Sequence, residues 1–331
     1  RRPASFSTAS TTVDASNGAA SSSYEFILPD ARGGARVELG LVYRSDRGDS
    51  DAGKGWGLNL PVIERKRSSN LPYLNQGAGQ QLPHPRFPTE YDDFAWNGQP
   101  LVEICTIQAG ACAYGPDQSF RPELNGWKYY RLQKEGEGSF IRFFHFADWG
   151  PARPPFDRWQ VEYKDGSIET YGGEWLADET DSTHPTLQGD ARGGAVPTGS
   201  VPVRWNLAQR VDSHTSGGAP LNFVTFKWWR PHPFGRSLLS DIWYTPHADP
   251  AKRTDTPAAA HHVHLEWEAH DFPFPHFAPL DRAVPDMRLK RVDVSSRLDT
   301  SAASQSQPRT LIRRYRLDYY QQDVDAHRAD P

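Results

Sequence analysis

The feature that most constrains the fold of this chain is an alternating apolar run followed by closely spaced glycines. Residues 37–43 place apolar side chains at every second position, and residues 53–61 carry glycines at the same spacing before Pro61. Alternation of this kind predicts a half-buried strand, and glycine lets the backbone pass close to a neighbour before proline ends the strand that follows. We therefore predict a strand, a tight glycine turn and a second strand.

Helix breakers and aromatic residues extend this prediction to the whole chain. The 331 residues include 27 Gly and 28 Pro, which leave few windows long enough for a helix. The 11 Trp, 13 Tyr and 16 Phe, against a single Met, favour strands. The prediction is an all-β fold of antiparallel sheets and hairpins. Further strand candidates of similar length lie at residues 127–132, 140–146, 221–229, 238–244, 262–268, 289–295 and 311–320.

Segments with few large apolar side chains divide the chain. Residues 1–23 are mostly Ser, Thr and Ala, and such a segment buries too little surface to offset the entropy of ordering. We expect a flexible leader over residues 1–23 and one β domain over residues 24–331, as a fragment of a longer polypeptide. Residues 180–200 and 249–260 share the leader's character and are expected to form long loops between strand groups.

Charge and hydropathy exclude two classes of partner. The net charge is −4, and basic residues are interspersed with acidic ones, so no basic stripe offers contacts to nucleic acid. No window approaches the ~20 apolar residues of a membrane span. The first residues also lack the pattern of a signal peptide, which leaves three alternatives: a removed signal, another export route or a fragment.

The order of elements in the first 65 residues resembles the SpvB-type domain, which opens the B component of bacterial ABC insecticidal toxin complexes. Weaker elements extend the resemblance from about residue 18 to residue 320. Among them, residues 159–172 resemble the strand, Asp-Gly turn and strand of RHS tyrosine-aspartate repeats, with Asp165 and Gly166 at the turn. The elements that carry the resemblance are residues 18–20, 24–29, 32–34, 39–43, 55–58, 61–65, 91–94, 97–102, 159–172, 205–212 and 314–319.

The resemblance implies a secreted structural domain without catalytic activity or cofactor. In such toxins the B component and an RHS-repeat C component form a β-sheet shell around a toxic C-terminal polypeptide, and the B side docks onto a pore-forming A component. A shell domain taken alone is expected to expose a sheet edge and to associate with itself. Two alternatives remain open: a carbohydrate-binding β module, and the non-catalytic N-terminal domain of an ADP-ribosylating virulence protein.

The glycine turn is expected to have a structural role. The indole of Trp56 is predicted to pack onto the sheet that carries Leu39 and Leu41, while Gly55 and Gly57 allow close backbone approach. Truncation of Trp56 to Ala is then expected to cost roughly 3–5 kcal/mol.

Two histidines are the candidate metal ligands of the sequence. His262 and His264 are two residues apart, so on a strand both imidazoles lie on one face. His270 or Asp271 is a candidate third ligand. The favoured interpretation is a solvated His-rich strand without metal, because no Cys or carboxylate cluster in the sequence completes a coordination shell.

Cys105 and Cys112 are the only cysteines. In a reducing compartment they would be two small buried side chains, whereas in a secreted protein they are expected to form a disulfide across a hairpin. The disulfide follows from the secreted assignment.

Aromatic and acidic pairs offer two further alternatives. Exposed tryptophans on a sheet can bind sugar rings, but core packing is the favoured role of Trp228, Trp229, Trp243 and Trp267. The Glu-x-Glu pairs at residues 135–137 and 266–268 are typical of ADP-ribosyltransferases, yet charge on a solvated sheet face or turn explains them better.

Overall fold

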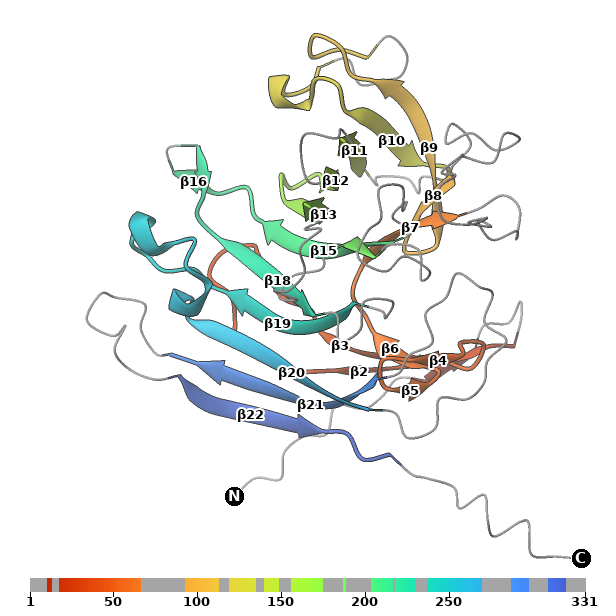
Figure 1. Cartoon of the computed structure of the whole chain (residues 1–331), viewed down its shortest axis with the longest axis vertical. Helices are drawn as coiled ribbons and strands as arrows, with labels where there is room; N and C mark the ends of the chain where they lie inside the picture. The colour runs from red at the N-terminus through yellow and green to blue at the C-terminus, as the bar shows by residue number, and fades with distance from the viewer. Residues whose placement is uncertain are drawn as a thin grey trace, which may run out of the picture.

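A computed structural model confirms the all-β, antiparallel fold class. It describes residues 11–13, 18–66, 93–112, 119–134, 140–148, 156–174, 187–188, 204–216, 218–229, 237–269, 287–297 and 309–319. Most of the strands belong to one 14-stranded sheet. Part of this sheet closes on itself and part remains open (Figure 1).

The first part of the large sheet is a closed barrel of eight strands, which the sequence did not predict. Strand β15 closes the barrel, because its first residues pair with β7 and its later residues pair with β13. The barrel strands are β7 (Val62–Lys66), β8 (Asp93–Trp96), β9 (Gln99–Thr106), β10 (Lys128–Leu132), β11 (Arg142–Asp148), β12 (Phe156–Glu162), β13 (Ile168–Glu174) and β15 (Arg204–Val211).

The second part is an open sheet that continues from β15 through β18. Side chains alternate along β18, where Val224, Phe226 and Trp228 are buried and the residues between them are partly exposed. The alternation gives this sheet one face in the core and one polar face. Its strands are β18 (Phe223–Trp229), β19 (Leu238–Tyr244), β20 (His261–Ala269), β21 (Met287–Ser296) and β22 (Thr310–Arg316).

A small four-stranded sheet contacts the C-terminal strand of the open sheet. The ring centroids of Phe26 and Tyr315 are 4.8 Å apart, and the Ile27 backbone N–H donates a 2.7 Å hydrogen bond to the Tyr315 hydroxyl. One apolar cluster of buried residues joins this sheet, the open sheet and the barrel. The strands are β1 (Thr11–Val13), β2 (Ala20–Glu25), β3 (Gly40–Arg44) and β6 (Trp56–Leu58).

The segment expected to be a flexible leader differs from that expectation where the structure describes it. Residues 11–13 pair with residues 20–22, and β2 pairs along its length with β3. The boundary expected at residue 23 therefore falls inside β2. Backbone hydrogen bonding to neighbouring strands orders this part, which has few apolar side chains of its own.

The Arg32-Gly33-Gly34 turn is fastened to the connection between β15 and β18. The Gly34 N–H donates a 2.9 Å hydrogen bond to Asp212, and Arg32 donates a 3.0 Å bond to Asn222. Gly33 has a φ of +75°, and a Cβ there would lie 2.2 Å from the Asn222 amide nitrogen. The turn therefore requires glycine, both for its backbone conformation and for its close contact.

Short elements complete the described part of the chain. The small strands are β4 (Asp49–Ser50), β5 (Gly53–Lys54), β14 (Leu187–Gln188), β16 (Thr215–Ser216) and β17 (Ala219–Pro220). The 3-10 helices are η2 (Pro122–Leu124), η3 (Pro250–Lys252) and η4 (Thr256–Ala258). Helices η3 and η4 lie within the expected loop 249–260. Among the described residues, the structure has no helix with the length and hydropathy of a membrane span.

Candidate functional site

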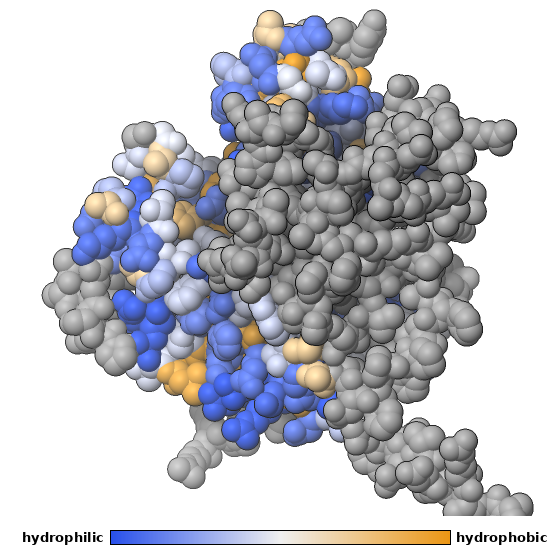
Figure 2. All heavy atoms as spheres, viewed as in Figure 1, coloured by the Kyte–Doolittle hydropathy of each residue, from blue (hydrophilic) through white to orange (hydrophobic). Residues whose placement is uncertain are grey.

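The polar face of the open sheet carries a row of charged and ionisable side chains. Strand pairing aligns one residue from each of five neighbouring strands, and their side chains alternate between basic and acidic types. Figure 2 shows mostly hydrophilic residues over the described strands in the lower part of the molecule. The row consists of Lys227, Asp241, His264, Asp293 and Arg314.

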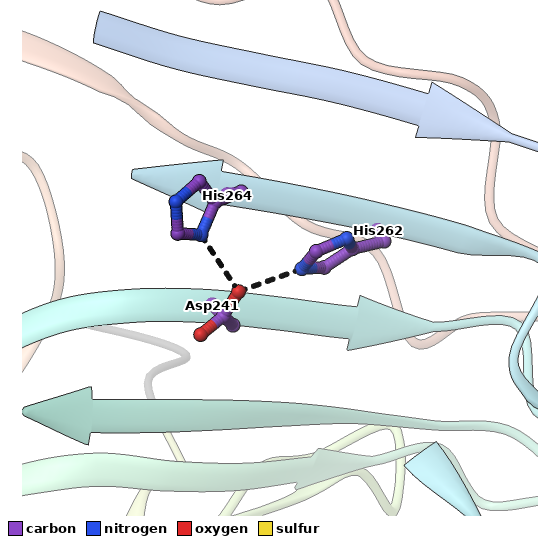
Figure 3. Close-up of side chains that lie close together, drawn as sticks. All are labelled: Asp241, His262 and His264. Carbon is purple, nitrogen blue, oxygen red and sulfur yellow. Dashed lines mark hydrogen bonds and ion pairs between the residues drawn. The ribbon is translucent and has the colours of Figure 1, made fainter. Parts of the chain in front are cut away.

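Asp241 meets two histidines at the centre of this row. Its Oδ1 lies 2.7 Å from His262 Nε2 and 2.9 Å from His264 Nδ1 (Figure 3). One ligand atom from each of the three residues lies within 4.8 Å of the other two. Asp241 belongs to β19 and the histidines to β20, so the pairing of two adjacent strands assembles the cluster.

The charges of this cluster support one another. Burial acts to raise the pKa of Asp241, but hydrogen bonds from His262, His264 and Ser240 outweigh it and hold the pKa well below its ordinary value. The hydrogen bond to Asp241 raises the pKa of His264 above 6.5, against the opposing effect of burial. The carboxylate is therefore ionised and strongly attracts positive charge.

An aromatic side chain fixes the orientation of one histidine. The rings of Trp243 and His262 stack at 3.6 Å with an interplanar angle of 7°. The Arg309 guanidinium carbon lies 4.7 Å from the centroid of the Trp243 ring. Stacking limits the rotation of the imidazole and keeps Nε2 directed at Asp241.

A second His-Asp contact lies inside the barrel and was not predicted. His145 Nε2 lies 2.7 Å from Asp157 Oδ1, and the Trp205 indole N–H donates a 2.7 Å hydrogen bond to the same oxygen. Both members of the pair are buried. The rings of Phe94 and Trp159 lie within 5.5 Å of the His145 ring, so the pair is set in an aromatic core.

The glycine turn lies between β5 and β6 and at the start of β6. Trp56 pairs with Tyr43 on β3 at a ring-centroid distance of 5.3 Å, and it is partly buried against the cluster that contains Leu41. A Cβ at Gly55 would lie 2.5 Å from the Tyr43 ring, and one at Gly57 would lie 2.6 Å from the Arg47 side chain. The backbone approach at both glycines is close.

Asp165 and Gly166 form the turn between β12 and β13. Asp165 Oδ1 accepts hydrogen bonds of 2.9 Å from the Ser167 N–H and 2.6 Å from the Ser167 hydroxyl. Gly166 has a φ of +81°, and a Cβ there would lie 2.9 Å from Ser213. Both residues thus serve the turn geometry.

The two cysteines are joined in a disulfide with a Cα–Cα distance of 6.0 Å. Cys112 belongs to a small buried cluster with Phe120, Leu124 and Tyr129, and Cys105 packs against it. This cluster is separate from the main core and lies beside β9 and β10.

The tryptophans of the open sheet divide between its two faces. Trp228 and Trp267 are buried, and their indole N–H groups donate to the backbone carbonyls of Leu207 and Leu239. Trp229 is partly buried, like Trp243. Because the four side chains lie on two faces of the sheet, they do not form one continuous aromatic platform.

The acidic pair on β20 has basic partners. Glu266 contacts Lys290 and Arg291, and Glu268 contacts Arg288. The pair at residues 135–137 and the candidate third metal ligands, His270 and Asp271, lie outside the described residues.

Asp241 is the cluster residue that sequence reasoning missed. The sequence predicted strands at 238–244 and 262–268, and the structure forms both as β19 and β20. Antiparallel pairing of these consecutive strands places Asp241 opposite His264. A search for carboxylates across the predicted strand pair, instead of along one strand, would have found it.

Residues 14–184 match the SpvB family, described as Salmonella virulence plasmid 65kDa B protein. The chain therefore belongs to the SpvB family. No curated protein sequence matches the chain significantly.

Solved structures share the fold at low sequence identity. The structure of the N-terminal domain of effector protein SpvB from Salmonella typhimurium strain LT2 is 18% identical, with a TM-score of 0.54 over 90% of this chain and 94% of that one. The crystal structure of TcdB2-TccC3 is 16% identical, with a TM-score of 0.60 over 93% of this chain. This chain spans only 15% of that longer polypeptide.

Proposed function

We propose that this chain is a structural shell domain of a bacterial toxin complex, where it helps to enclose and deliver a toxic C-terminal polypeptide. Its partners in this proposal are an RHS-repeat C component and a pore-forming A component, and its location is outside the producing cell. Membership of the SpvB family and the fold shared with a region of TcdB2-TccC3 support the proposal.

The edge of the open sheet carries the structural argument. Strand β22 is the last in the sheet order of the described residues, and its residues Leu311 and Ile312 are 47% and 54% exposed. An exposed strand edge presents backbone N–H and C=O groups, which must be capped or continued by another strand. A shell assembled from joined sheets supplies such a strand.

The proposal assigns no catalytic activity to the domain. The acidic side chains of β20 have basic partners, and the His145–Asp157 pair is enclosed by aromatic rings. These arrangements suit ion pairing and core packing, because catalysis requires groups that can reach a substrate.

Measurements of self-association and of co-assembly test whether β22 is a sheet edge that pairs with another chain. Light scattering should show the isolated chain associating as its concentration rises, and a Leu311→Lys/Ile312→Lys double variant should associate less, because charge blocks edge pairing. Val102→Lys is the matched control: Val102 is 42% exposed, but its strand β9 has partners on both sides.

Co-expression with an RHS-repeat C component should yield a complex that the double variant weakens. A chain that stays monomeric and forms no such complex would contradict the proposal.

A second candidate function rests on the share of the two chains that aligns. The N-terminal domain of the SpvB effector aligns with this chain over nearly the length of both. The same fold could therefore serve as the non-catalytic N-terminal domain of an ADP-ribosylating virulence protein. Sequencing of the downstream reading frame distinguishes the two: RHS repeats favour the shell, and a transferase domain favours the effector.

A further inference from the structure

The Asp241 cluster on the open sheet has the composition of a metal site. Two imidazole nitrogens and one carboxylate oxygen converge from β19 and β20, all within 4.8 Å of one another. Nitrogen and oxygen ligands in this ratio suit Zn²⁺ and its neighbours among the transition metals. Ca²⁺ and Mg²⁺ prefer shells made wholly of oxygen.

The distances between the donors leave room for an ion after small side-chain rotations. Two ligand atoms each about 2.1 Å from a tetrahedral ion lie about 3.4 Å apart. The carboxylate oxygen lies 2.7 Å and 2.9 Å from the two histidine nitrogens. These two contacts therefore need to open by about 0.7 Å and about 0.5 Å, respectively. Such a change is within the reach of side chains on a fixed backbone.

A neighbouring side chain holds one ligand of the cluster in place. The indole of Trp243 holds the His262 ring by stacking at 3.6 Å. Asp293, the cross-strand neighbour of His264 on its other side, is ion-paired with Arg314 and Arg291, so its charge is already balanced. Groups that orient the ligands raise the affinity of a metal site.

The cluster is also accessible to solvent. The side chains of Asp241, His262 and His264 are 22%, 18% and 44% exposed, respectively. Three protein ligands at an accessible site leave a fourth position for water. We propose that Asp241, His262 and His264 bind one divalent transition-metal ion of the Zn²⁺ class, which clips β19 to β20 on the polar face of the open sheet.

The proposal is tested by titrating ZnCl₂ into the full chain, prepared without a polyhistidine tag and freed of metal by chelation and dialysis. Calorimetry should show saturable binding of one ion per chain, and bound Zn²⁺ should raise the melting temperature. Asp241→Asn, His262→Gln and His264→Gln should each lower the affinity by more than the roughly 10–100-fold that loss of an outer-shell partner costs. Co²⁺ should give the intense visible absorption of a four- or five-coordinate site.

A matched control exists in the connection between β15 and β16. His214 lies 3.0 Å from Asp212, with a side chain 66% exposed, and forms a His-Asp contact with a single histidine. His214→Gln should leave Zn²⁺ affinity unchanged. Circular dichroism checks that each variant is folded, and His264→Gln, at the most exposed of the three ligands, decides the matter if another variant fails to fold. Absence of saturable binding, or equal affinity in wild type and folded His264→Gln, would overturn the proposal.

Discussion

The barrel and the open sheet each place a carboxylate against histidine, with opposite surroundings. In the barrel, Asp157 meets His145 and the Trp205 N–H, and all three side chains are buried. In the open sheet, Asp241 meets His262 and His264 on a partly exposed face. The same residue types therefore form a buried polar contact in the barrel core. On the surface of the open sheet they form the proposed set of metal ligands.

The difference shows that enclosure, more than residue type, decides what a His-Asp contact can do. A buried polar pair must satisfy its own hydrogen bonds, because no water is available to replace a lost partner. An exposed cluster can exchange its internal hydrogen bonds for water or an ion at small cost. The barrel pair is therefore expected to matter for folding and the sheet cluster for binding.

The largest effect should come from removing the barrel carboxylate. Asp157→Ala leaves His145 and the Trp205 N–H without their acceptor, which should lower the free energy of unfolding by about 3–5 kcal/mol. Asp241→Ala on the open sheet should cost less, about 1.5–3 kcal/mol, because it removes hydrogen bonds to a charged group whose partners keep some access to water. Urea unfolding monitored by Trp fluorescence measures both. Equal losses in the two variants would remove the contrast between the regions.

Substitution of Trp56 tests how much the packing of the small four-stranded sheet contributes to stability. Because its indole is only partly buried, Trp56→Ala should cost about 3 kcal/mol, the lower end of the range for truncating a large aromatic residue. Trp56→Phe keeps a ring against Tyr43 and should recover most of the loss. Thermal unfolding compares them. An unchanged melting temperature in Trp56→Ala would show that the indole does not contribute to the packing.

Removal of the disulfide is a second test of the barrel region, with a smaller expected effect on stability. Cys105 and Cys112 are separated by seven positions, so the bridge closes a short loop. Replacing both with Ser should cost about 2.5 kcal/mol through the entropy of the unfolded chain. Zn²⁺ binding at the open sheet should be unaffected, since the two sites share no contact. Chemical unfolding with and without reductant gives the measurement, and wild type under reduction should match the double variant.

The pH dependence of stability tests the role of Asp212, which lies in the connection between β15 and β18. Burial acts to raise its pKa, but hydrogen bonds from Gly34, Asn222 and His214 outweigh it and hold the pKa below 3.8. The folded pKa is lower than the unfolded one, so the stabilisation is present above pH 3.8 and is lost as pH falls through the folded pKa.

Asp212→Asn should remove this pH dependence. The variant should be less stable near neutral pH by about 1 kcal/mol, with a smaller further loss between about pH 5 and pH 2. Unfolding in urea across this range gives the two curves. Parallel curves for wild type and variant would show that another group causes the acid sensitivity.

Local patterns predicted the strands, whereas contacts between distant segments escaped prediction. The alternation in residues 238–244 and the Asp165-Gly166 turn each depend on near neighbours, and both predict the local structure that forms. The barrel depends on pairing between β7 and β15, and nothing in either strand specifies the other. The role of Asp241 was missed for the same reason, because its partners lie on another strand.

The closing role of β15 sets an order of events during synthesis. The contact between Glu64 and Arg204 joins residues 140 positions apart, and the one between Ile27 and Tyr315 joins residues 288 positions apart. A ribosome delivers residues at about 5–20 per second, so β7 waits roughly 7–28 s for its final partner. During that interval its edge is open to other chains. Nascent chains that stall before residue 211 should therefore depend on chaperones more than those that stall after it.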